Sequence, residues 1–322
     1  MPFFMTQGFG AFNDNVFKNA LAALLVFESS KMAGLNTDQL VNFSAMVFIL
    51  PFFLFSALFG QFADKYEKSM QIRRVKLLEV VIMLLATLGF WLDNVPLLMF
   101  VLFLLGLQST IFGPIKYGIL PRILKREELV GGNALIEMGT FVAILGGTIA
   151  GPQLAGIEAS WPYWASAACL AVAVTGYLFS LRIPPSPAVA PDLEISWNIF
   201  AETVRNMKFI NQNRTVLNSV LGISWFWFFG AIFLVQIPSY TQNVLGGDKH
   251  LMSALLALFI IGISTGSLLC ERLSGKQVEI GLVPFGAIGL TLFGLDLYFA
   301  SPEAPVAGIT VMEFLADGNN WR

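Results

Sequence analysis

The chain has 322 residues, of which 56% are hydrophobic and only 12% are charged, and its formal net charge at pH 7 is −2. A soluble domain has about 25% charged residues, so this composition excludes an ordinary soluble protein and indicates an integral membrane protein. The weak negative charge provides no field that attracts nucleic acid. One histidine, His250, and two cysteines in apolar runs, Cys169 and Cys270, favour neither triad catalysis nor a disulfide framework. We therefore expect no metal and no cofactor.

Nine apolar runs reach the length of about 20 residues that a transmembrane helix needs. In chain order they are 2–27, 43–62, 77–95, 97–117, 134–157, 161–181, 215–238, 251–269 and 280–300. The sequence thus predicts an all-α membrane protein with about nine spans.

The distribution of basic residues predicts the orientation of these spans, because cytoplasmic loops are enriched in Lys and Arg. Most of the 19 Lys and Arg residues follow the second, fourth, sixth and eighth runs, whereas the other connections carry only Lys31 and Lys249. We expect a cytoplasmic N-terminus and a multi-pass protein.

A polar stretch separates the sixth run from the seventh. It begins with several prolines, which favour an extended linker, and then places apolar residues at helical spacing, as in a helix that lies on a membrane surface. These residues are Pro184, Pro185, Pro187 and Pro191, followed by Trp197, Phe200, Val204 and Met207. We predict three parts: a six-helix half at 1–181, a cytoplasmic linker with an amphipathic helix at 182–214, and an incomplete half at 215–322.

A short repeat supports a two-halved design. Residues 60–65, after the second span, and residues 267–272, after the eighth, each end in an acid and a base. Two matching halves of six spans are typical of secondary transporters. Since the second half stops after three spans, we expect about nine of twelve helices, that is, a C-terminally truncated fragment.

Charged residues within spans are the first candidates for function, because one charge at the centre of a bilayer costs about 2.5–3.5 kcal/mol. Asp14 lies in the first span between Asn13 and Asn15, with Lys18 four residues later on the same face. A self-neutralising Asp14–Lys18 pair is one interpretation. A polar cluster that lines a translocation cavity is the other.

A second candidate cluster lies near the cytoplasmic end of the fourth span, where Lys116 and Tyr117 follow Gly113 and Pro114. Lys116 could simply extend to the interface. Glu137, in the fifth span at a matching depth, could instead form an ion pair with Lys116, and both would then face the cavity.

The connection after the second span resembles the loop signature of the major facilitator superfamily. We expect a gating loop there, formed by Gly60, Asp64, Lys65, Arg73 and Arg74. In the fifth span, Gly147 to Pro152 resembles the glycine-proline motif of proton-coupled drug antiporters in that superfamily. A face of small residues for helix packing explains the same glycines.

Read together, four segments resemble the lysophospholipid transporter branch of the major facilitator superfamily. They are residues 10–15 (GAFNDN), 60–64 (GQFAD), 114–120 (PIKYGIL) and 132–137 (GNALIE). The resemblance implies a bundle of that superfamily's type, transport of lysophospholipid across the bacterial inner membrane for reacylation, and a partner or fused acyltransferase domain. It also implies that Asp14, Lys116 and Glu137 handle a lipid headgroup.

Three alternatives remain open at this point. A proton-coupled exporter of amphipathic drugs would use Asp14 as its proton site. The chain could also be the membrane part of a bifunctional transporter and acyltransferase, although His250 is not followed five residues later by the aspartate that such an enzyme needs. A membrane anchor without transport activity is the third. We favour the transporter, which is not an enzyme.

Overall fold

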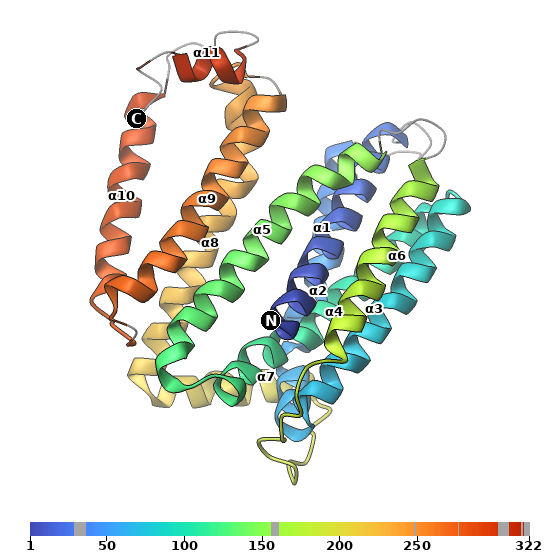
Figure 1. The fold of residues 1–322 in the computed structure, drawn as a ribbon, viewed down its shortest axis with the longest axis vertical. Coiled ribbons are helices and arrows are strands. Elements are labelled where there is room, and N and C mark those ends of the chain that lie inside the picture. Colours follow the sequence, from blue (N-terminus) through green and yellow to red (C-terminus); the bar gives the residue numbers. More distant parts are fainter. Residues whose placement is uncertain are drawn as a thin grey trace. The chain divides into compact units, whose positions relative to one another are not determined.

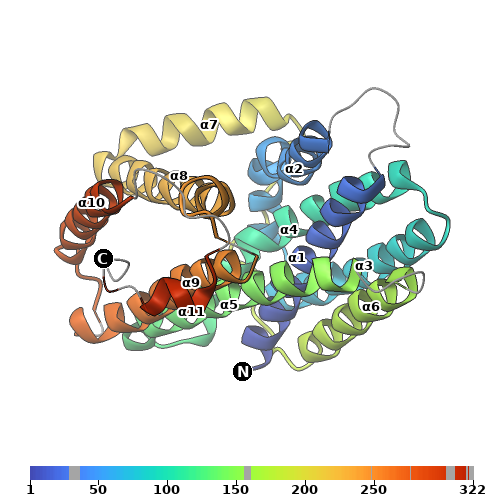
Figure 2. The ribbon, with the colours of Figure 1, turned by 90° about the horizontal axis from the view of Figure 1, so that it is seen from above.

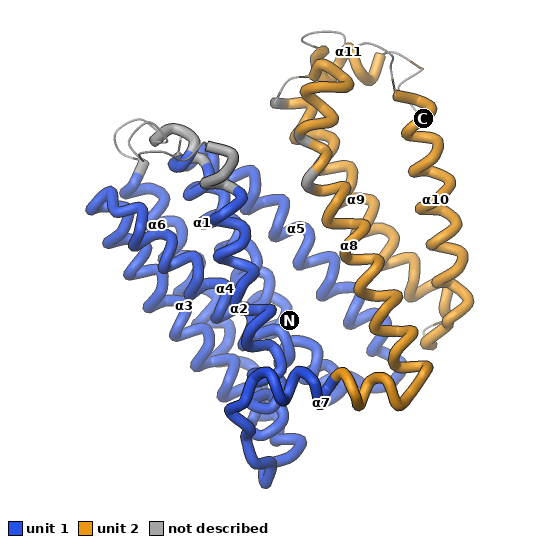
Figure 3. The backbone as a smooth tube through the Cα atoms, turned by 180° about the vertical axis from the view of Figure 1, so that it is seen from behind, with its two compact units in different colours: residues 1–206 blue, residues 207–322 orange. Residues whose placement is uncertain are grey.

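A computed structural model describes residues 1–28, 37–155, 161–247, 249–275, 277–301, 309–316 and 318, and it is helical through most of this length (Figure 1). The chain divides into two compact units, Met1–Asn206 and Met207–Arg322 (Figure 3). Each unit is described separately below.

Unit 1 contains six long helices and a short 3₁₀ helix, η2 (Arg126–Glu128). The long helices are α1 (Pro2–Glu28), α2 (Thr37–Lys65), α3 (Lys68–Trp91), α4 (Val95–Ile123), α5 (Leu129–Ala155) and α6 (Trp161–Ser180). Helix α1 packs against α2, α4, α5 and α6, and α3 packs against α4 and α6 (Figure 2). The position of α1 among four neighbours explains why its polar residues are buried.

Unit 2 contains α8 (Arg214–Asn243), α9 (Lys249–Leu273), α10 (Leu282–Ala300) and the short α11 (Val311–Ala316). Helix α9 contacts α8 and α11. The hydroxyls of Tyr240 and Ser301 lie 2.8 Å apart and join the end of α8 to the end of α10. Helix α7 (Ile199–Gln212) crosses the boundary between the units.

Each of the nine predicted runs is found as a long helix, so the predicted all-α membrane fold is confirmed. Among the described residues, seven helices are long and apolar enough to cross a membrane: α2, α4, α5, α6, α8, α9 and α10. The other two, α1 and α3, have 27 and 24 residues but carry more polar and charged side chains. Lys31 and Lys276, which contributed to the charge pattern, lie outside the described residues.

Helices α3 and α4 extend beyond the apolar runs predicted as spans. Helix α3 begins at Lys68 rather than near residue 77, because Glu67 caps its first turn by accepting hydrogen bonds from the backbone N–H groups of Ser69 and Met70. Helix α4 continues to Ile123 rather than ending near residue 117. Both helices therefore extend well beyond their apolar runs, into sequence that carries basic residues.

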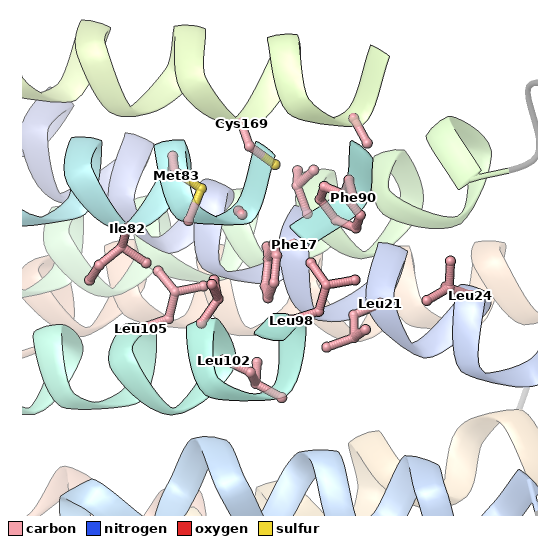
Figure 4. Close-up of a cluster of buried hydrophobic side chains, with 14 of the residues drawn as sticks. Phe17, Leu21, Leu24, Ile82, Met83, Phe90, Leu98, Leu102, Leu105 and Cys169 are labelled. Carbon is pink, nitrogen blue, oxygen red and sulfur yellow. The ribbon is translucent and has the colours of Figure 1, made fainter. Parts of the chain in front are cut away.

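Two clusters of buried apolar side chains form layers at opposite ends of unit 1. The first joins α1, α3, α4 and α6 and includes Phe17 and Phe90, whose ring centroids are 5.6 Å apart (Figure 4). The second contains Phe3, Ile72 and Ile115 of α1, α3 and α4, together with residues of α2 and α5 and Ile183. Since both clusters draw on α1, α3 and α4, the residues between them on these helices lie in a separate middle layer.

Glycines of α5 allow α1 to approach closely. A β-carbon added at Gly147 would lie 2.6 Å from the carbonyl oxygen of Phe12, and one at Gly151 would lie 2.7 Å from the carbonyl oxygen of Val16. No side chain fits at these distances. Packing against α1 is therefore what Gly147 and Gly151 do in this structure, in agreement with the packing interpretation of the glycine-rich segment.

Candidate functional site: a polar layer in unit 1

A polar layer lies between the two apolar layers of unit 1. On α1, α3 and α4, the residues between the two apolar clusters include buried polar side chains. We define the polar layer as Asn13 and Asp14 of α1, Lys76 and Glu79 of α3, and Gln108 and Ser109 of α4. Buried polar groups of this kind are stable only when they are paired.

The carboxylate of Glu79 is the centre of this layer. It accepts hydrogen bonds from Lys76 Nζ at 2.6 Å, from Asn13 Nδ2 at 3.0 Å and from Gln108 Nε2 at 3.3 Å. The side chains of Lys76 and Glu79 are each 1% exposed. One carboxylate thus ties three helices together, and its charge is compensated by an equally buried ammonium.

Gly10 provides the space for the Lys76 ammonium. The position of a β-carbon at Gly10 would overlap Lys76 Nζ, and one at Gly176 would lie 3.9 Å from the same atom. A larger residue at position 10 would therefore displace the ammonium. This contact explains why residue 10, the first of the segment at 10–15, is a glycine. From the sequence alone, the segment was notable only for its resemblance to a known family.

Asp14 is bound on one side only. Its Oδ2 accepts a hydrogen bond from Ser109 Oγ at 2.6 Å, whereas its Oδ1 has no hydrogen-bond partner among the described residues. The Oδ1 atom of Asn13 is likewise buried without a partner there. Asp14 is 9% exposed, and a buried acceptor that makes no hydrogen bond lowers the stability of the folded state.

The neighbours of Asp14 on α1 point elsewhere. Lys18 Nζ lies 5.7 Å from the ring centroid of Phe48, and no ion pair joins it to Asp14 in the part of the chain that the structure describes. Asn15 donates to the carbonyl oxygen of Ala11 in its own helix, and its β-carbon faces Gly147 of α5. The hydrogen bond that Asp14 accepts therefore comes from another helix, from Ser109 of α4, and not from Lys18.

Lys116 belongs to a second polar group, which also involves α1. Its Nζ donates a hydrogen bond to Thr140 Oγ1 at 2.8 Å, and Thr140 Oγ1 lies 2.9 Å from Gln7 Oε1. The Lys116 ammonium also lies 5.3 Å from the ring centroid of Tyr117. Lys116 is therefore held within the bundle by α5 and α1 instead of extending freely to the interface.

The predicted ion pair between Lys116 and Glu137 was wrong. Both residues are described, and no ion pair joins them; Glu137 Oε1 accepts a hydrogen bond from the Tyr117 hydroxyl at 2.7 Å, while Lys116 is bonded to Thr140. Each of the two charged groups is hydrogen-bonded to a hydroxyl group instead of to the opposite charge. The physical reason is that Thr140 lies one turn beyond Glu137 on α5, where its hydroxyl reaches Lys116 first.

The two polar groups are seven residues apart on both α1 and α4. Asp14 pairs with Ser109 at one level, whereas Gln7 and Lys116 meet through Thr140 at the other. Seven residues are two helical turns, so the levels are separated by about 10 Å along the helix axis and lie on the same helix faces. We call these two polar levels, with the acid Asp14 in one and the base Lys116 in the other, the polar route.

The expected gating loop is mostly helical. Gly60, Asp64 and Lys65 lie in the last turns of α2, and Arg73 and Arg74 lie in the second turn of α3, so the connection itself is only Tyr66 and Glu67. The segment that repeats in the second half, residues 267–272, similarly lies in the last turns of α9. The positions of Lys65, Arg73 and Arg74 are therefore set by the helices that contain them, α2 and α3.

The extended segment after α6 is bound to this connection. We call residues 183–197 the strap. The backbone N–H groups of Val189 and Ala190 both donate to the Asp64 carbonyl oxygen at 3.0 Å. Arg73 donates to the Ile183 carbonyl oxygen at 3.0 Å, and the amide side chain of Gln61 forms two hydrogen bonds with the backbone of Ser196. The strap is thus attached along its length to the ends of α2 and α3.

Glu67 joins α3 to the strap, and this makes the attachment sensitive to pH. Burial alone would raise the pKa of Glu67, but hydrogen bonds from the Ser69 side chain and from backbone N–H groups, including that of Ser186 at 2.6 Å, lower this pKa below its ordinary value of 4.5. A lowered folded-state pKa stabilises the folded form above the ordinary value. That contribution is lost as the pH falls through the folded-state pKa.

We expect Glu67→Gln to destabilise unit 1 by about 0.5–2 kcal/mol at pH 7, the usual value of a helix cap. The difference from the wild type should shrink as the pH falls from 4.5 through the lower folded-state pKa of Glu67, because the wild-type carboxylate becomes protonated over that range. Chemical unfolding in detergent at several pH values measures this difference. Glu194→Gln, an exposed residue of the same strap, is the control and should have no effect at any pH. A difference independent of pH would contradict the assignment.

Of the six residues in the polar layer, only Asn13 and Asp14 were identified from the sequence. The four that were missed are Lys76, Glu79, Gln108 and Ser109. A signal was present, since Glu79 is an acid within an apolar run and lies three residues after a lysine. Thr140 and Gln7 gave no comparable signal because they are uncharged.

Comparisons with known proteins agree with this architecture. The model of the Major Facilitator Superfamily matches residues 3–316. Similar curated proteins include the "Lysophospholipid transporter LplT" of Enterobacter sp. (strain 638), which is 28% identical over 301 residues that cover 90% of this chain and 70% of the relative. The protein of the same name from Escherichia coli O7:K1 is 28% identical over 292 residues, or 88% of this chain and 68% of the relative. That of Serratia proteamaculans is 28% identical over 301 residues, with 90% and 70% covered.

Proposed function

The chain belongs to the major facilitator superfamily of membrane transporters, and on this premise we propose that it moves lysophospholipid across the membrane. The observation that carries the proposal is the polar route of unit 1. In it, Asp14 has one carboxylate oxygen without a partner among the described residues, and Lys116 is hydrogen-bonded to one hydroxyl group. The two residues lie about two helical turns apart on the same helix faces. The names of the similar curated transporters support it.

The chemistry of a lysophospholipid fits this route. Its phosphate needs a cation, and Lys116 is a compact charge with three N–H donors, of which one is used by Thr140. Its single acyl chain needs an apolar surface, which the Phe- and Leu-rich helices supply.

The cellular setting is part of the same proposal. We place the chain in the bacterial inner membrane with its N-terminus in the cytoplasm, as the Lys and Arg distribution indicates. The transported lipid would then be reacylated by an acyltransferase that is a partner or a fused domain. Residues 1–181 would form one half of the transporter, and 215–322 would contribute the first three helices of the other.

A second candidate function is proton-coupled efflux of amphipathic drugs. The observation that favours it is Asp14 Oδ1, a buried carboxylate oxygen without a partner among the described residues, which is a suitable site for a proton. This alternative predicts that transport depends on a pH gradient. Collapsing the gradient with an ionophore should abolish drug export but leave lysophospholipid uptake by a facilitative carrier unchanged.

We expect Lys116→Gln and Asp14→Asn each to reduce uptake of radiolabelled lysophosphatidylethanolamine at least about tenfold, because a charged hydrogen bond contributes about 1.5–3 kcal/mol. Lys116→Arg keeps the charge but changes its shape, so partial activity is expected. The amount of inserted protein should hardly change, since removing a charge from a span relieves an insertion cost of about 2.5–3.5 kcal/mol. The measurement is uptake into spheroplasts, normalised to membrane-inserted protein.

Two further variants test the alternatives. Lys125→Gln removes a lysine at the N-cap of η2 and should leave uptake unchanged. If Asp14 served only to neutralise Lys18, the double variant Asp14→Asn/Lys18→Gln would recover the activity lost in Asp14→Asn. Wild-type uptake in both Lys116→Gln and Asp14→Asn would contradict the assignment of the route.

A further inference from the structure

Helix α2 carries a continuous line of aromatic side chains. The steps between them are four, three, four, three and four residues, which places them on one face of the helix. We call this set the aromatic stripe; its members are Phe48, Phe52, Phe55, Phe59, Phe62 and Tyr66. In four of the pairs of neighbours the ring centroids are 5.9, 6.2, 6.0 and 5.8 Å apart, so the rings form a nearly continuous surface.

The aromatic stripe is accessible along the side of α2. Within unit 1, this helix packs mainly against α4 (Figure 2), and its buried residues include Pro51 and Leu58. Phe52 and Tyr66 are each 37% exposed, and the other four members of the stripe are half-buried. A hydrocarbon chain can therefore contact these rings without displacing α4.

Contact with the bilayer alone does not explain an aromatic residue at every position of the stripe. Elsewhere on α2 the exposed apolar side chains are of mixed type, and they include Met46, Ile49 and Leu50. A phenylalanine ring has a flat face and only two rotatable bonds, so it loses little conformational freedom when another molecule packs on it. A line of such rings is a rigid surface for a flexible hydrocarbon chain.

The aromatic stripe runs beside the polar route. At its first ring, Lys18 Nζ of α1 lies 5.7 Å from the centroid of Phe48. A β-carbon at Gly106 would overlap the carbonyl oxygen of Phe48, so these two residues of α4 and α2 lie at one level. On both helices the residue numbers increase from the first apolar cluster to the second, so α2 and α4 run in the same direction. Ser109 and Lys116 follow Gly106 by three and ten residues, so the stripe passes both levels of the polar route.

We propose that the aromatic stripe is the surface on which the acyl chain of the transported lipid lies while its headgroup is in the polar route. The inference rests on the proposed function and adds the part of the substrate site that recognises the chain. Rings recur along α2 about every 5 Å. The chain can therefore shift along the stripe, as the headgroup passes from one level of the route to the other, without losing its apolar contact.

The length of the stripe agrees with this assignment. Phe48 and Phe62 differ by 14 residues, or about 21 Å along the helix. An extended chain of 16 carbons is about 19 Å long, because each bond of about 1.5 Å advances the chain by about 1.3 Å. A chain of six carbons is only about 6 Å long, whereas Phe52 and Phe59 are about 10 Å apart along α2. The long chain contacts both of these rings at once, and the short chain contacts only one.

The test compares lysophosphatidylethanolamines with acyl chains of 16 and of six carbons, transported by the full chain reconstituted in phospholipid vesicles. The double variant Phe52→Ala/Phe59→Ala removes two rings that only the long chain spans. We expect it to lower the ratio of kcat/KM for the long lipid to that for the short lipid about tenfold, because apolar contact with each ring contributes to binding. Phe53→Ala is the matched control: Phe53 is 79% exposed on another face of α2, and its loss should leave the ratio unchanged.

A second measurement does not depend on transport. A lysophosphatidylethanolamine with a diazirine at the end of a 16-carbon chain is photoactivated with the wild-type protein in vesicles, and the labelled residues are identified by mass spectrometry. We expect label on the aromatic stripe, and an excess of unlabelled 16-carbon lipid should remove most of it, whereas the six-carbon lipid should remove less. Label on Phe53 comes from lipid of the surrounding bilayer and should not respond to either competitor.

The possible failures are distinguishable. A wild-type ratio in an active double variant, or an equal loss for both chain lengths, would overturn the inference but leave lysophospholipid transport intact, because a purely structural role of the rings affects both lipids alike. If the double variant fails to insert, the labelling decides, and label on the stripe that resists competition would also overturn the inference. A wild-type protein that transports neither lipid would overturn the proposed function, whereas competed label would still identify the stripe as a surface that binds acyl chains.

Discussion

Replacing one member of the Lys76–Glu79 ion pair should destabilise unit 1 by about 3–5 kcal/mol, since the remaining charge would be buried without compensation. Both side chains are 1% exposed, and their nitrogen and oxygen atoms are 2.6 Å apart. In Lys76→Gln, the Glu79 carboxylate would keep only the amide donors of Asn13 and Gln108. In Glu79→Gln, the Lys76 ammonium would lose the carboxylate oxygen that lies 2.6 Å away.

The double variant Lys76→Gln/Glu79→Gln distinguishes charge from packing. It carries no charge at either position, and its amide oxygen at position 79 can still accept from Asn13, so most of the lost stability should return. For all three variants, thermal unfolding in detergent is measured as the fraction of protein that remains monodisperse. Lys125→Gln is a matched control for the loss of a lysine and should change stability by no more than about 0.5 kcal/mol. Single variants that unfold like the wild type would show that water reaches this pair.

Replacing glycine with alanine in α5 should separate α1 from α5 and destabilise unit 1 by about 1–3 kcal/mol for each site. The β-carbon at position 147 would lie 2.6 Å from the Phe12 carbonyl oxygen and 2.9 Å from the Val16 nitrogen, both backbone atoms that cannot rotate away. At position 151 the neighbours are the carbonyl oxygen of Val16, at 2.7 Å, and the backbone nitrogen of Ala20, at 2.9 Å.

The effect on transport should follow the effect on stability. Phe12 and Val16 flank Asp14 on α1, so a shift of this helix lengthens the hydrogen bond between Asp14 and Ser109. We therefore expect Gly147→Ala to lower both the unfolding temperature and the rate of lipid uptake. Gly113→Ala is the matched control, because a β-carbon there meets nothing within 4 Å, and alanine in a helix is favoured over glycine by about 0.5–1 kcal/mol. Equal unfolding temperatures for the two variants would contradict this account of α5.

The membrane class, the helical fold and the family could all be predicted from the sequence. These properties depend on local composition: an apolar run of about 20 residues must become a helix in a bilayer, wherever it lies in the bundle. The segments at 10–15 and 114–120 are likewise local, and they indicated the superfamily whose model matches residues 3–316. Asp14 and Lys116 were also identified in this way, since a charge within an apolar run is visible without knowledge of its neighbours.

The partners of these charges were decided only by the tertiary structure. A pair between Asp14 and Lys18, four residues along the same helix, was one of two interpretations of the sequence, yet Asp14 accepts a hydrogen bond from Ser109, 95 positions away in the chain. A pair between Lys116 and Glu137 was also considered, but Lys116 donates to Thr140, three residues after Glu137 on α5. Glu79 is bound by three helices at once. Hydropathy fixes which residues enter the membrane, whereas the rotation and depth of each helix relative to its neighbours determine which polar atoms meet, and these follow from close packing at residues such as Gly147 and Gly10.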